Sequence, residues 1–448
     1  MRAHEHWSSR VSFLLASVGF AVGLGNIWRF PYVAGENGGA AFVLVYVAFA
    51  FGISVPILMA EILIGRRGGL SPPGSMRAVA IQEGHSPQWS LVGYMNLLAA
   101  FTIAVVYSAI VGWVLWYLFK AVTTGFAGVD TVAAETQFNA VLADTGGMVF
   151  WTAAGLFLTG AIIFSGVRKG IERAVTWLMP LLFLLLAVLV VYNVCAGGFA
   201  PAVDWMFTAD FSKITPRVML AAIGQAFFSI GVAMAAMMTY GAYLPKRVSI
   251  TQSVIIIISA DTAVALLAGL VVFPAVFNYG LDPAAGPGLI FQTLPVAFAQ
   301  MPGGYLFSVL FFLLLAVAGI TSMVGLIESL TAWLEEHRGF ARHKSALVVI
   351  LAIGLLSFPS ILSYNVLSEW RVFGRDFNGA MDYFANQILL PLGGLLIAVF
   401  GGWFLSREAS RDELALVEPQ LHSLWYFLIR YVVPPAVLII LVMGIATS

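Results

Sequence analysis

A short run near the start of the chain combines residue types that do not suit a simple membrane anchor. Residues 19–29 hold three glycines, an asparagine and an arginine, inside an apolar segment, residues 11–35, that is long enough to cross a bilayer. Each glycine weakens a helix by about 1 kcal/mol relative to alanine, so the backbone is expected to unwind there. Unwound carbonyl groups cannot face lipid, although they can line a cavity or hold an ion. The pattern indicates a cation site within the membrane.

Glycines at this spacing also occur where two helices pack closely, and a packing face is the alternative interpretation. Asn26 and Arg29 favour the cation site, because polar groups inside a membrane need partners. A second apolar segment, residues 217–243, repeats the interruption, since residues 224–231 contain a glutamine, a serine and two glycines. Two interrupted helices, each opening a group of five segments, are typical of transporters with inverted repeats and a site at the membrane midplane.

The composition predicts a membrane protein with many spans. The 448 residues are 60% hydrophobic and 10% charged, and their mean hydropathy is +0.94. The net charge is zero, so nothing indicates a nucleic-acid partner. Cys195 is the only cysteine, which excludes an intramolecular disulfide and a cysteine metal cluster. The six histidines avoid the middle of the spans and lack metalloprotease spacing, so an enzyme has little support.

Eleven apolar segments are predicted to span the membrane. With the amino terminus in the cytoplasm, sixteen of the 22 lysines and arginines fall on the inner side and six on the outer side. This asymmetry predicts a multi-pass protein of the inner (plasma) membrane with its amino terminus inside and its carboxyl terminus outside. The segments are residues 9–35, 39–64, 89–120, 148–165, 174–196, 217–243, 250–277, 304–334, 345–362, 380–405 and 424–446.

Four carboxylates lie within these segments or near their ends, where an unpaired charge is costly. Glu61 and Glu328 are interpreted as structural, whereas Asp261 lies well inside an apolar run and is interpreted as functional. For Asp382 the residues alone leave both roles open.

Hydroxyl groups inside the spans have a structural alternative as well. Thr321 and Ser322 are adjacent in an otherwise apolar helix, where such groups usually bond back to a carbonyl one turn earlier. Tyr107 is similarly compatible with packing or with ligand binding. The residue types and positions therefore leave the roles of these three residues open.

The motifs of this chain resemble those of the neurotransmitter:sodium symporter family over nearly its whole length. The resemblance implies an all-α polytopic membrane protein with the leucine-transporter-like fold, a 5+5 inverted repeat with broken helices 1 and 6, and an eleventh helix. One transporter domain, residues 1–448, would contain repeats at residues 9–196 and 217–405 and the last helix at residues 424–446. The matching motifs are residues 5–7, 19–31, 36–39, 169–173, 224–229, 239–240 and 318–322.

The resemblance implies two sodium sites built from hard oxygen ligands, which suit an alkali cation. In one site the substrate carboxylate is itself a ligand, which couples the two solutes directly. Asp261 takes its place in that site when the seventh helix is aligned on Gly269, and lies one residue further along when it is aligned on Pro274. The ligands of that site would be Ala21, Asn26, Ser229 and Asp261, and those of the other site Gly19, Val22, Ala318, Thr321 and Ser322.

The implied substrate is an amino acid that enters the cell with sodium by alternating access. Its carboxylate would accept hydrogen bonds from Tyr107 and from backbone amides near Leu24 and Gly25, at the positive end of a half-helix. Glycines and a methionine around the side chain indicate room for a bulky apolar group, although relatives that take small or omega-amino acids also have a glycine at the position of Gly231. The remaining implied contacts are Phe20, Ala21, Ile103, Phe228, Ser229, Met234, Ser322, Gly325 and Leu326.

Two gates are implied by the same resemblance. Arg29 and Asp382 would close the outer side above Phe228, which would lie over the substrate as a lid. The inner gate would use Trp7, His4 and Glu336, with a histidine where the family has an arginine. A sodium-permeable channel or a sensor on the same fold is the alternative from a different class of protein.

Chloride is not expected as a partner. Chloride-dependent members hold the anion beside the first sodium, between residues that match Tyr46, Gln225 and Ser229 and a serine of the seventh helix. Ala265 stands at the position of that serine, and Asp261 offers a fixed negative charge instead. The resemblance leaves the identity of the amino acid and the oligomeric state open.

Overall fold

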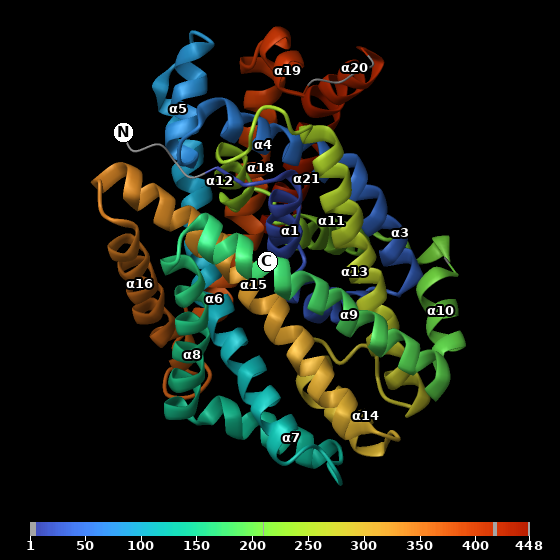
Figure 1. Cartoon of the computed structure of the whole chain (residues 1–448). Helices are drawn as coiled ribbons and strands as arrows, with labels where there is room; N and C mark the ends of the chain where they lie inside the picture. The colour runs from blue at the N-terminus through green and yellow to red at the C-terminus, as the bar shows by residue number, and fades with distance from the viewer. Residues whose placement is uncertain (1–5, 209, 415–418, 447–448) are drawn as a thin grey trace.

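The computed structural model describes residues 6–208, 210–414 and 419–446, and these residues are almost entirely helical (Figure 1). Nine of the described helices are long and apolar enough to cross a membrane, and a tenth span is formed by two helices that meet at an angle of 43°. A shorter apolar helix, α11 (Pro216–Ile230), and α12 (Ala236–Ala242) together occupy the sixth predicted segment. These elements account for all eleven predicted segments and confirm the predicted fold class.

Several spans consist of α-helix interrupted by a π-helical turn; the label η marks these turns and also the two short 3₁₀ helices η3 (Pro87–Trp89) and η5 (Phe211–Lys213). The first five spans comprise α1 (Arg10–Ala21), η1 (Gly25–Arg29) and α2 (Phe30–Glu36); α3 (Ala40–Phe49), η2 (Ala50–Ser54) and α4 (Val55–Gly68); α6 (Ser90–Thr123); α8 (Thr145–Phe164); and η4 (Val167–Glu172) with α9 (Arg173–Ala196).

The remaining spans follow the broken pair α11 and α12. They comprise α13 (Ile250–Asn278); α15 (Gly304–Arg338); α16 (Arg342–Leu362); α17 (Phe377–Tyr383), η7 (Phe384–Leu389), α18 (Leu390–Val399) and η8 (Phe400–Phe404); and α20 (Pro419–Phe427), η9 (Leu428–Val432) and α21 (Val433–Ala446).

Short helices outside the spans cover the two ends of the molecule. Figure 1 shows α5 and α19 at one end and α7 and α14 at the opposite end. We call these the inner and the outer end, following the orientation that the charge asymmetry predicts. The short elements are α5 (Pro72–Gln82), η3 (Pro87–Trp89), α7 (Thr131–Ala143), α10 (Phe199–Phe207), η5 (Phe211–Lys213), η6 (Leu289–Thr293), α14 (Leu294–Gln300) and α19 (Arg407–Leu414).

Both predicted breaks are present, and each has a visible cause. Helix α1 ends at Ala21, and Val22 is extended with φ −75° and ψ 97°. Helix α11 ends at Gly231, whose φ of 75° is left-handed. Ala233 and Ala235 follow with φ values of 61° and 63°, which are strained for residues with a Cβ atom.

Polar side chains satisfy backbone amides at both breaks. The Asn26 Oδ1 atom accepts a hydrogen bond of 3.0 Å from the Gly23 amide in the first break. In the second break the Ala233 amide donates to Glu61 Oε1 over 2.6 Å, and Glu61 is fully buried. This contact agrees with the structural role predicted for Glu61.

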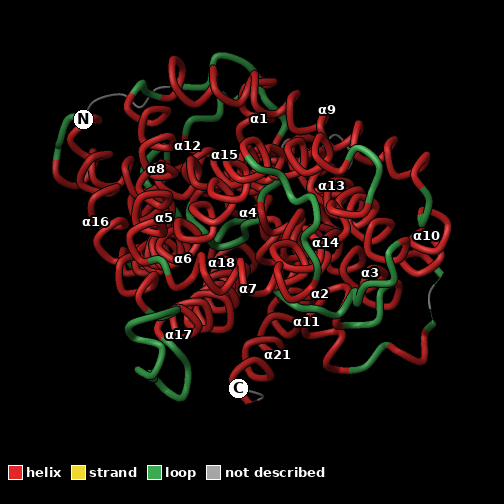
Figure 2. The backbone as a smooth tube through the Cα atoms, turned by 90° about the horizontal axis from the view of Figure 1, so that it is seen from below, coloured by secondary structure: helices red, strands yellow, loops and turns green. Residues whose placement is uncertain are grey.

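The broken helices lie at the centre of the bundle. In α1 every residue from Ala16 to Ala21 is buried, because α1 packs against α13 and α15. Figure 2, which views the molecule from below, shows helices filling the cross-section, whereas loops lie mainly toward its edge. One of these loops, residues 363–376, projects sideways just before α17.

Candidate functional site

Asp261 lies at the centre of a buried polar cluster that joins the two breaks. The Asn26 Nδ2 atom donates to Asp261 Oδ1 over 2.7 Å, to the Asp261 carbonyl over 2.9 Å and to Ser229 Oγ over 2.9 Å. Ser229 Oγ donates to Asp261 Oδ1 over 3.0 Å, and the Tyr46 hydroxyl donates to Asp261 Oδ2 over 3.1 Å. All four side chains are buried. Asn26 belongs to η1, Ser229 to α11, Asp261 to α13 and Tyr46 to α3.

This cluster carries a carboxylate without a basic partner. Among the described residues no lysine, arginine or histidine nitrogen lies within 4.0 Å of the Asp261 carboxylate. A buried carboxylate in that situation is stabilised by a bound cation, and the surrounding groups are hard oxygen and amide ligands. Because Asp261 itself meets Asn26 and Ser229, the structure follows the alignment on Gly269. These residues fit a sodium ion.

The carboxyl end of α1 meets two hydroxyl groups of α15. Ser322 Oγ donates to the Phe20 carbonyl over 3.0 Å. Thr321 Oγ1 donates to the carbonyls of Val317 and Ala318, over 3.0 and 3.1 Å, within its own helix. The last carbonyls of α1 have no partner inside the helix and form its negative end, which favours a cation.

Close packing brings Gly19 to the same place. A Cβ atom added to Gly19 would lie 3.6 Å from Thr321 Cβ and 2.9 Å from Met179 Sδ of α9. A side chain at this position would therefore separate α1 from α15 and α9. The structure thus brings Gly19, Thr321 and Ser322 together beside the break in which Val22 is extended, and Ala318 lies one turn before Ser322.

A small cavity of about 30 Å³ lies between these two clusters. At its edge the Tyr107 hydroxyl accepts a hydrogen bond of 2.8 Å from the Leu24 amide, at the start of the outer half of the first span. The lining brings together eleven of the residues predicted to contact the substrate. The lining residues are Phe20, Ala21, Gly23, Gly25, Ile103, Tyr107, Phe228, Ser229, Gly231, Met234, Ser322 and Leu326.

Two predicted substrate contacts lie elsewhere. Leu24 does not line the cavity, and its side chain packs near Gly319 of α15. Gly325 is covered by Phe20, whose ring would lie 2.2 Å from a Cβ atom added there. A Cβ atom on Gly231 would lie 2.4 Å from the same ring. In this structure the two glycines therefore make room for Phe20, so the space they create is not open to a substrate side chain.

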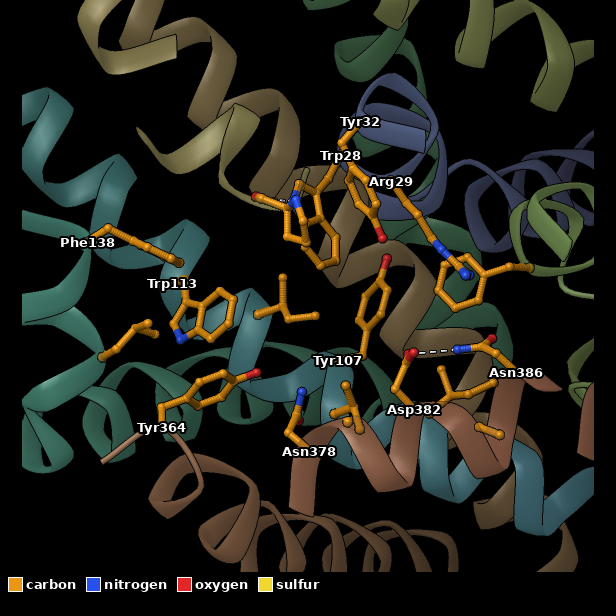
Figure 3. Close-up of a pocket in the computed structure, with 18 residues that line it drawn as sticks. Trp28, Arg29, Tyr32, Tyr107, Trp113, Phe138, Tyr364, Asn378, Asp382 and Asn386 are labelled. Atoms are coloured by element: carbon orange, nitrogen blue, oxygen red, sulfur yellow. Dashed lines mark hydrogen bonds between the residues drawn. The ribbon is translucent and has the colours of Figure 1, made fainter. Parts of the chain in front are cut away.

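A larger cavity of about 310 Å³ opens above Phe228 and Tyr107 toward the outer end (Figure 3). The Arg29 guanidinium lies 4.3 Å from the centre of the Phe228 ring. Asp382 accepts a hydrogen bond of 2.7 Å from Asn386 Nδ2. Figure 3 shows Arg29 and Asp382 reaching into this vestibule from different helices, and no ion pair within 4.0 Å joins these two described residues.

The inner end is sealed around Trp7. The Trp7 amide donates to the Tyr243 carbonyl over 3.1 Å, and its Nε1 atom donates to the Tyr240 carbonyl over 3.0 Å. The ring is 2% exposed and packs edge-on against both tyrosines. Glu336 accepts a hydrogen bond of 2.6 Å from the Ser71 amide. His4, the third residue predicted for the inner gate, lies outside the described residues.

Two polar contacts at the inner end were not predicted. Glu172, at the junction of η4 and α9, accepts hydrogen bonds from Ser8 N and Ser8 Oγ over 2.7 and 2.6 Å. Arg168 of η4 donates to the His6 carbonyl over 3.0 Å. Residues 169–173 are one of the motifs that carry the family resemblance, but nothing in their spacing identified Ser8 as a partner of Glu172.

The second unpredicted contact surrounds Glu328. This buried carboxylate accepts hydrogen bonds from Arg342 over 2.5 and 3.2 Å and from the Tyr243 hydroxyl over 3.0 Å. Arg342 also lies 3.4 Å from Glu335. Glu328 had been interpreted as structural, and the cost of an unpaired buried charge was the signal that a cationic partner existed. The network links α15, α16 and the residue that follows α12.

Comparisons with known proteins agree with this arrangement. A family model described as the sodium:neurotransmitter symporter family matches residues 4–139 and 134–448. An uncharacterized sodium-dependent transporter of Bacillus subtilis, YhdH, is 35% identical over 442 residues, which cover 97% of this chain and 96% of the relative. The sodium-dependent dopamine transporter of Bos taurus is 27% identical over 99% of this chain and 69% of its own length.

A solved structure is similar over the same range. The crystal structure of MhsT in complex with L-phenylalanine has a TM-score of 0.91 and 38% identity to this chain, and it covers 98% of this chain and 100% of its own. The family consists of sodium-coupled transporters and is not a class of enzymes. From the match over almost its whole length and the two broken spans, this chain belongs to the sodium:neurotransmitter symporter family and is a sodium-dependent, multi-pass membrane transporter.

Proposed function

We propose that this transporter imports a neutral, hydrophobic amino acid together with two sodium ions. The observation that carries the proposal is the position of Ser229. Its hydroxyl belongs to the cluster around Asp261, and the residue also lines the small cavity below Phe228. A substrate carboxylate in that cavity would lie beside the first sodium and complete its coordination, so each solute would strengthen binding of the other.

The residues of this proposal have separate roles. Ala21, Asn26, Ser229 and Asp261 hold the first sodium, and the second lies between the end of α1 and the hydroxyls of Thr321 and Ser322. Tyr107 and the amides of the first break hold the substrate carboxylate, since Tyr107 already contacts the Leu24 amide. Phe20, Ile103, Met234 and Leu326 surround the side chain with apolar atoms.

The hydrophobic class of substrate has two supports. The cavity walls are formed mainly by apolar and aromatic side chains. The similar protein MhsT was solved with L-phenylalanine. The present cavity of about 30 Å³ is too small for a bulky amino acid, so a large side chain requires the Phe20 ring to turn away from Gly231 and Gly325. Rotamer changes of this kind are common when a binding site adapts to its ligand.

Sodium-driven uptake into proteoliposomes tests the proposal. Radiolabelled L-phenylalanine is offered under an inward sodium gradient, or under an equal potassium or choline gradient, without a proton gradient. We expect accumulation above the outside concentration with sodium alone. Full accumulation in potassium or choline medium would refute sodium coupling. A thermal-shift screen of amino acids in sodium then ranks the substrates, and stabilisation by glycine or γ-aminobutyrate alone would favour the small or omega-amino class.

The same assay separates a carrier from a channel or a sensor, because neither of these concentrates a solute. Asn26→Ala provides a sharper variant, since Asn26 contacts both Ser229 and Asp261. We expect its affinities for sodium and substrate to fall together, as reciprocal linkage requires. Thr159→Ala is a matched control, because Thr159 is equally buried and bonds only to the Gly155 carbonyl of its own helix in the described structure.

A further inference from the structure

A groove of about 660 Å³ lies on the outside of the bundle, away from the transport site. One wall is the loop that joins α16 to α17, and the other is the outward face of α17 and η7. Trp370 and Phe373 of the loop face Met381, Phe384 and Ile388 of the helix across it. The ring of Trp370 also stacks on Phe377, with 6.1 Å between the ring centres. The groove is therefore mostly aromatic and aliphatic.

The tip of the loop presents a phenylalanine in an unusual way. Val372 and Arg375 exchange two backbone hydrogen bonds of 2.7 and 3.1 Å, which closes a tight turn around Phe373 and Gly374. The φ values of these two residues are 51° and 77°, a conformation that favours asparagine or glycine. The Phe373 side chain is 99% exposed. A strained backbone that keeps an aromatic ring fully exposed at the rim of the groove indicates a function for the ring.

The loop is placed where lipid would meet it. Figure 2 shows the loop projecting sideways from the bundle beside α17, and Figure 1 shows the outer ends of α8 and α16 in the same region. The groove continues along the spanning element at residues 377–404, as far as Ile388, about 16 Å from its start. It therefore runs from the membrane surface into the hydrocarbon layer.

The loop carries two arginines near the surface end of the groove, and Arg375 lines the groove itself. Arg375 lies with its guanidinium 4.5 Å from the centre of the Tyr383 ring, which holds the cation at the groove. The Arg371 side chain is 53% exposed, and its Nη1 atom lies 3.9 Å from Asp376 Oδ2. Arginine beside tryptophan and phenylalanine is the usual composition of a membrane-interface anchor.

We propose that this groove binds a membrane phospholipid. One acyl chain lies between Phe373 and the Met381–Ile388 face, and the phosphate diester lies at Arg375, which lines the groove. The bound lipid would support α17 from outside, and the opposite face of this helix contributes Asn378, Gly379 and Asp382 to the vestibule. The proposal concerns a lipid site and does not depend on the identity of the transported amino acid.

The test compares lipid binding in Phe373→Asn and Val366→Asn. Asparagine suits the left-handed backbone at position 373, so the turn is retained while the ring is removed. Val366 lies in the same loop and is 74% exposed, but it does not line the groove. The full-length protein is purified in mild detergent, incubated with dioleoyl phosphatidylglycerol or phosphatidylethanolamine, and analysed by native mass spectrometry. We expect Phe373→Asn to weaken lipid retention about tenfold, because one phenyl ring no longer contacts the acyl chain. Val366→Asn should retain lipid like the wild type.

A second measurement covers the case in which a variant folds poorly. Quenching of tryptophan fluorescence by brominated phosphatidylcholine is compared between the wild type and Trp370→Phe, so that the difference reports Trp370 alone. We expect Trp370 to be quenched by the brominated lipid and shielded from aqueous iodide. Equal lipid retention in both asparagine variants would overturn the proposal. Quenching by iodide instead of lipid would also overturn it, and so would a dimer that dissociates only in Phe373→Asn, because a second copy would then occupy the groove.

Discussion

At the scale of single residues, charge explains why Asp261 occupies its position. In the proposed function, two cations and a substrate zwitterion enter a region of low dielectric constant, where net positive charge is costly. Asp261 places a covalently attached negative charge beside Asn26 and Ser229. Tyr46 donates to the same carboxylate. Tyr46 and Ser229 match anion ligands of chloride-dependent relatives, and in this chain both bond to a carboxylate instead. Under this proposal, transport does not need a mobile anion.

This argument predicts that uptake does not depend on chloride. Replacing chloride by gluconate at constant sodium should leave the rate of substrate uptake unchanged. Asp261→Asn combined with Ala265→Ser should lower uptake in gluconate by about tenfold or more and restore it with chloride, because the loss of one buried charge costs several kcal/mol. The single variant Ala265→Ser serves as the control and should behave like the wild type. Chloride dependence of the wild type would show that Asp261 does not replace the anion.

Residue types identified polar groups that are unusual for a membrane span, and the family resemblance then assigned several of them to one site. Asn26, Ser229 and Asp261 were predicted to share one site, and they lie within hydrogen-bonding distance of one another. Their sodium ligation stays a prediction. Gly231 and Gly325 illustrate what composition does not provide. A glycine indicates space, but only the packed structure identifies Phe20 as the side chain that fills it.

At the scale of elements, residues 6–8, just before α1, contact two different parts of the inner end, the end of α12 and the junction of η4 and α9. Trp7 bonds to the backbone at the end of α12, whereas Ser8 bonds to Glu172 at the start of α9 and the His6 carbonyl accepts from Arg168. Opening the inner end therefore requires this segment to leave one partner or the other.

Glu172→Ala should release this contact and favour the inward-open state. Two hydrogen bonds to a charged carboxylate contribute about 2–3 kcal/mol, so the open population should rise by about 30-fold or more. The measurement is the rate at which maleimide labels Phe13→Cys in a Cys195→Ser background with sodium present, since Phe13 is fully buried. Thr176→Val is the control, because Thr176 lies one turn along α9 and bonds only to the Glu172 carbonyl in the described structure. Labelling of Glu172→Ala at the wild-type rate would exclude this role.

Elements were predictable in proportion to their length and apolarity. All eleven apolar segments are helical in the described structure, and ten of them, counting the bent pair as one, are long and apolar enough to span, because about twenty apolar residues in succession have few alternatives to a membrane helix. The surface helices α7 and α14 were not predicted, because α7 mixes polar and apolar residues and the apolar run of α14 is short. A local signal for α7 was present in Asp130, whose side chain caps the helix by accepting from the Ala133 amide over 2.8 Å.

At the scale of the whole molecule, the two ends of the described structure differ. The inner end is closed by Trp7 and by the Glu328–Arg342 pair, whereas the outer end has a vestibule of about 310 Å³ that reaches Phe228. Arg29 lies on the Phe228 ring and Asp382 bonds to Asn386, so each charge has a partner other than its predicted one. This arrangement corresponds to an outward-facing state, in which the predicted outer gate has yet to form.

Closing the vestibule would bring Arg29 and Asp382 out of water together, and it is the pairing of these charges that would compensate for their desolvation. Asp382→Ala leaves Arg29 to be buried alone, which should slow closure and reduce turnover about tenfold or more while equilibrium binding of substrate changes little. Uptake at saturating substrate and equilibrium binding in detergent, measured on the same preparation, separate the two effects. Asn386→Ala is the matched control, because it removes the present partner of Asp382 and keeps the charge. If Asp382→Ala transports at the wild-type rate at saturating substrate, closure of the outer end does not use this ion pair, and the stacking of Arg29 on Phe228 is then the contact that forms the gate.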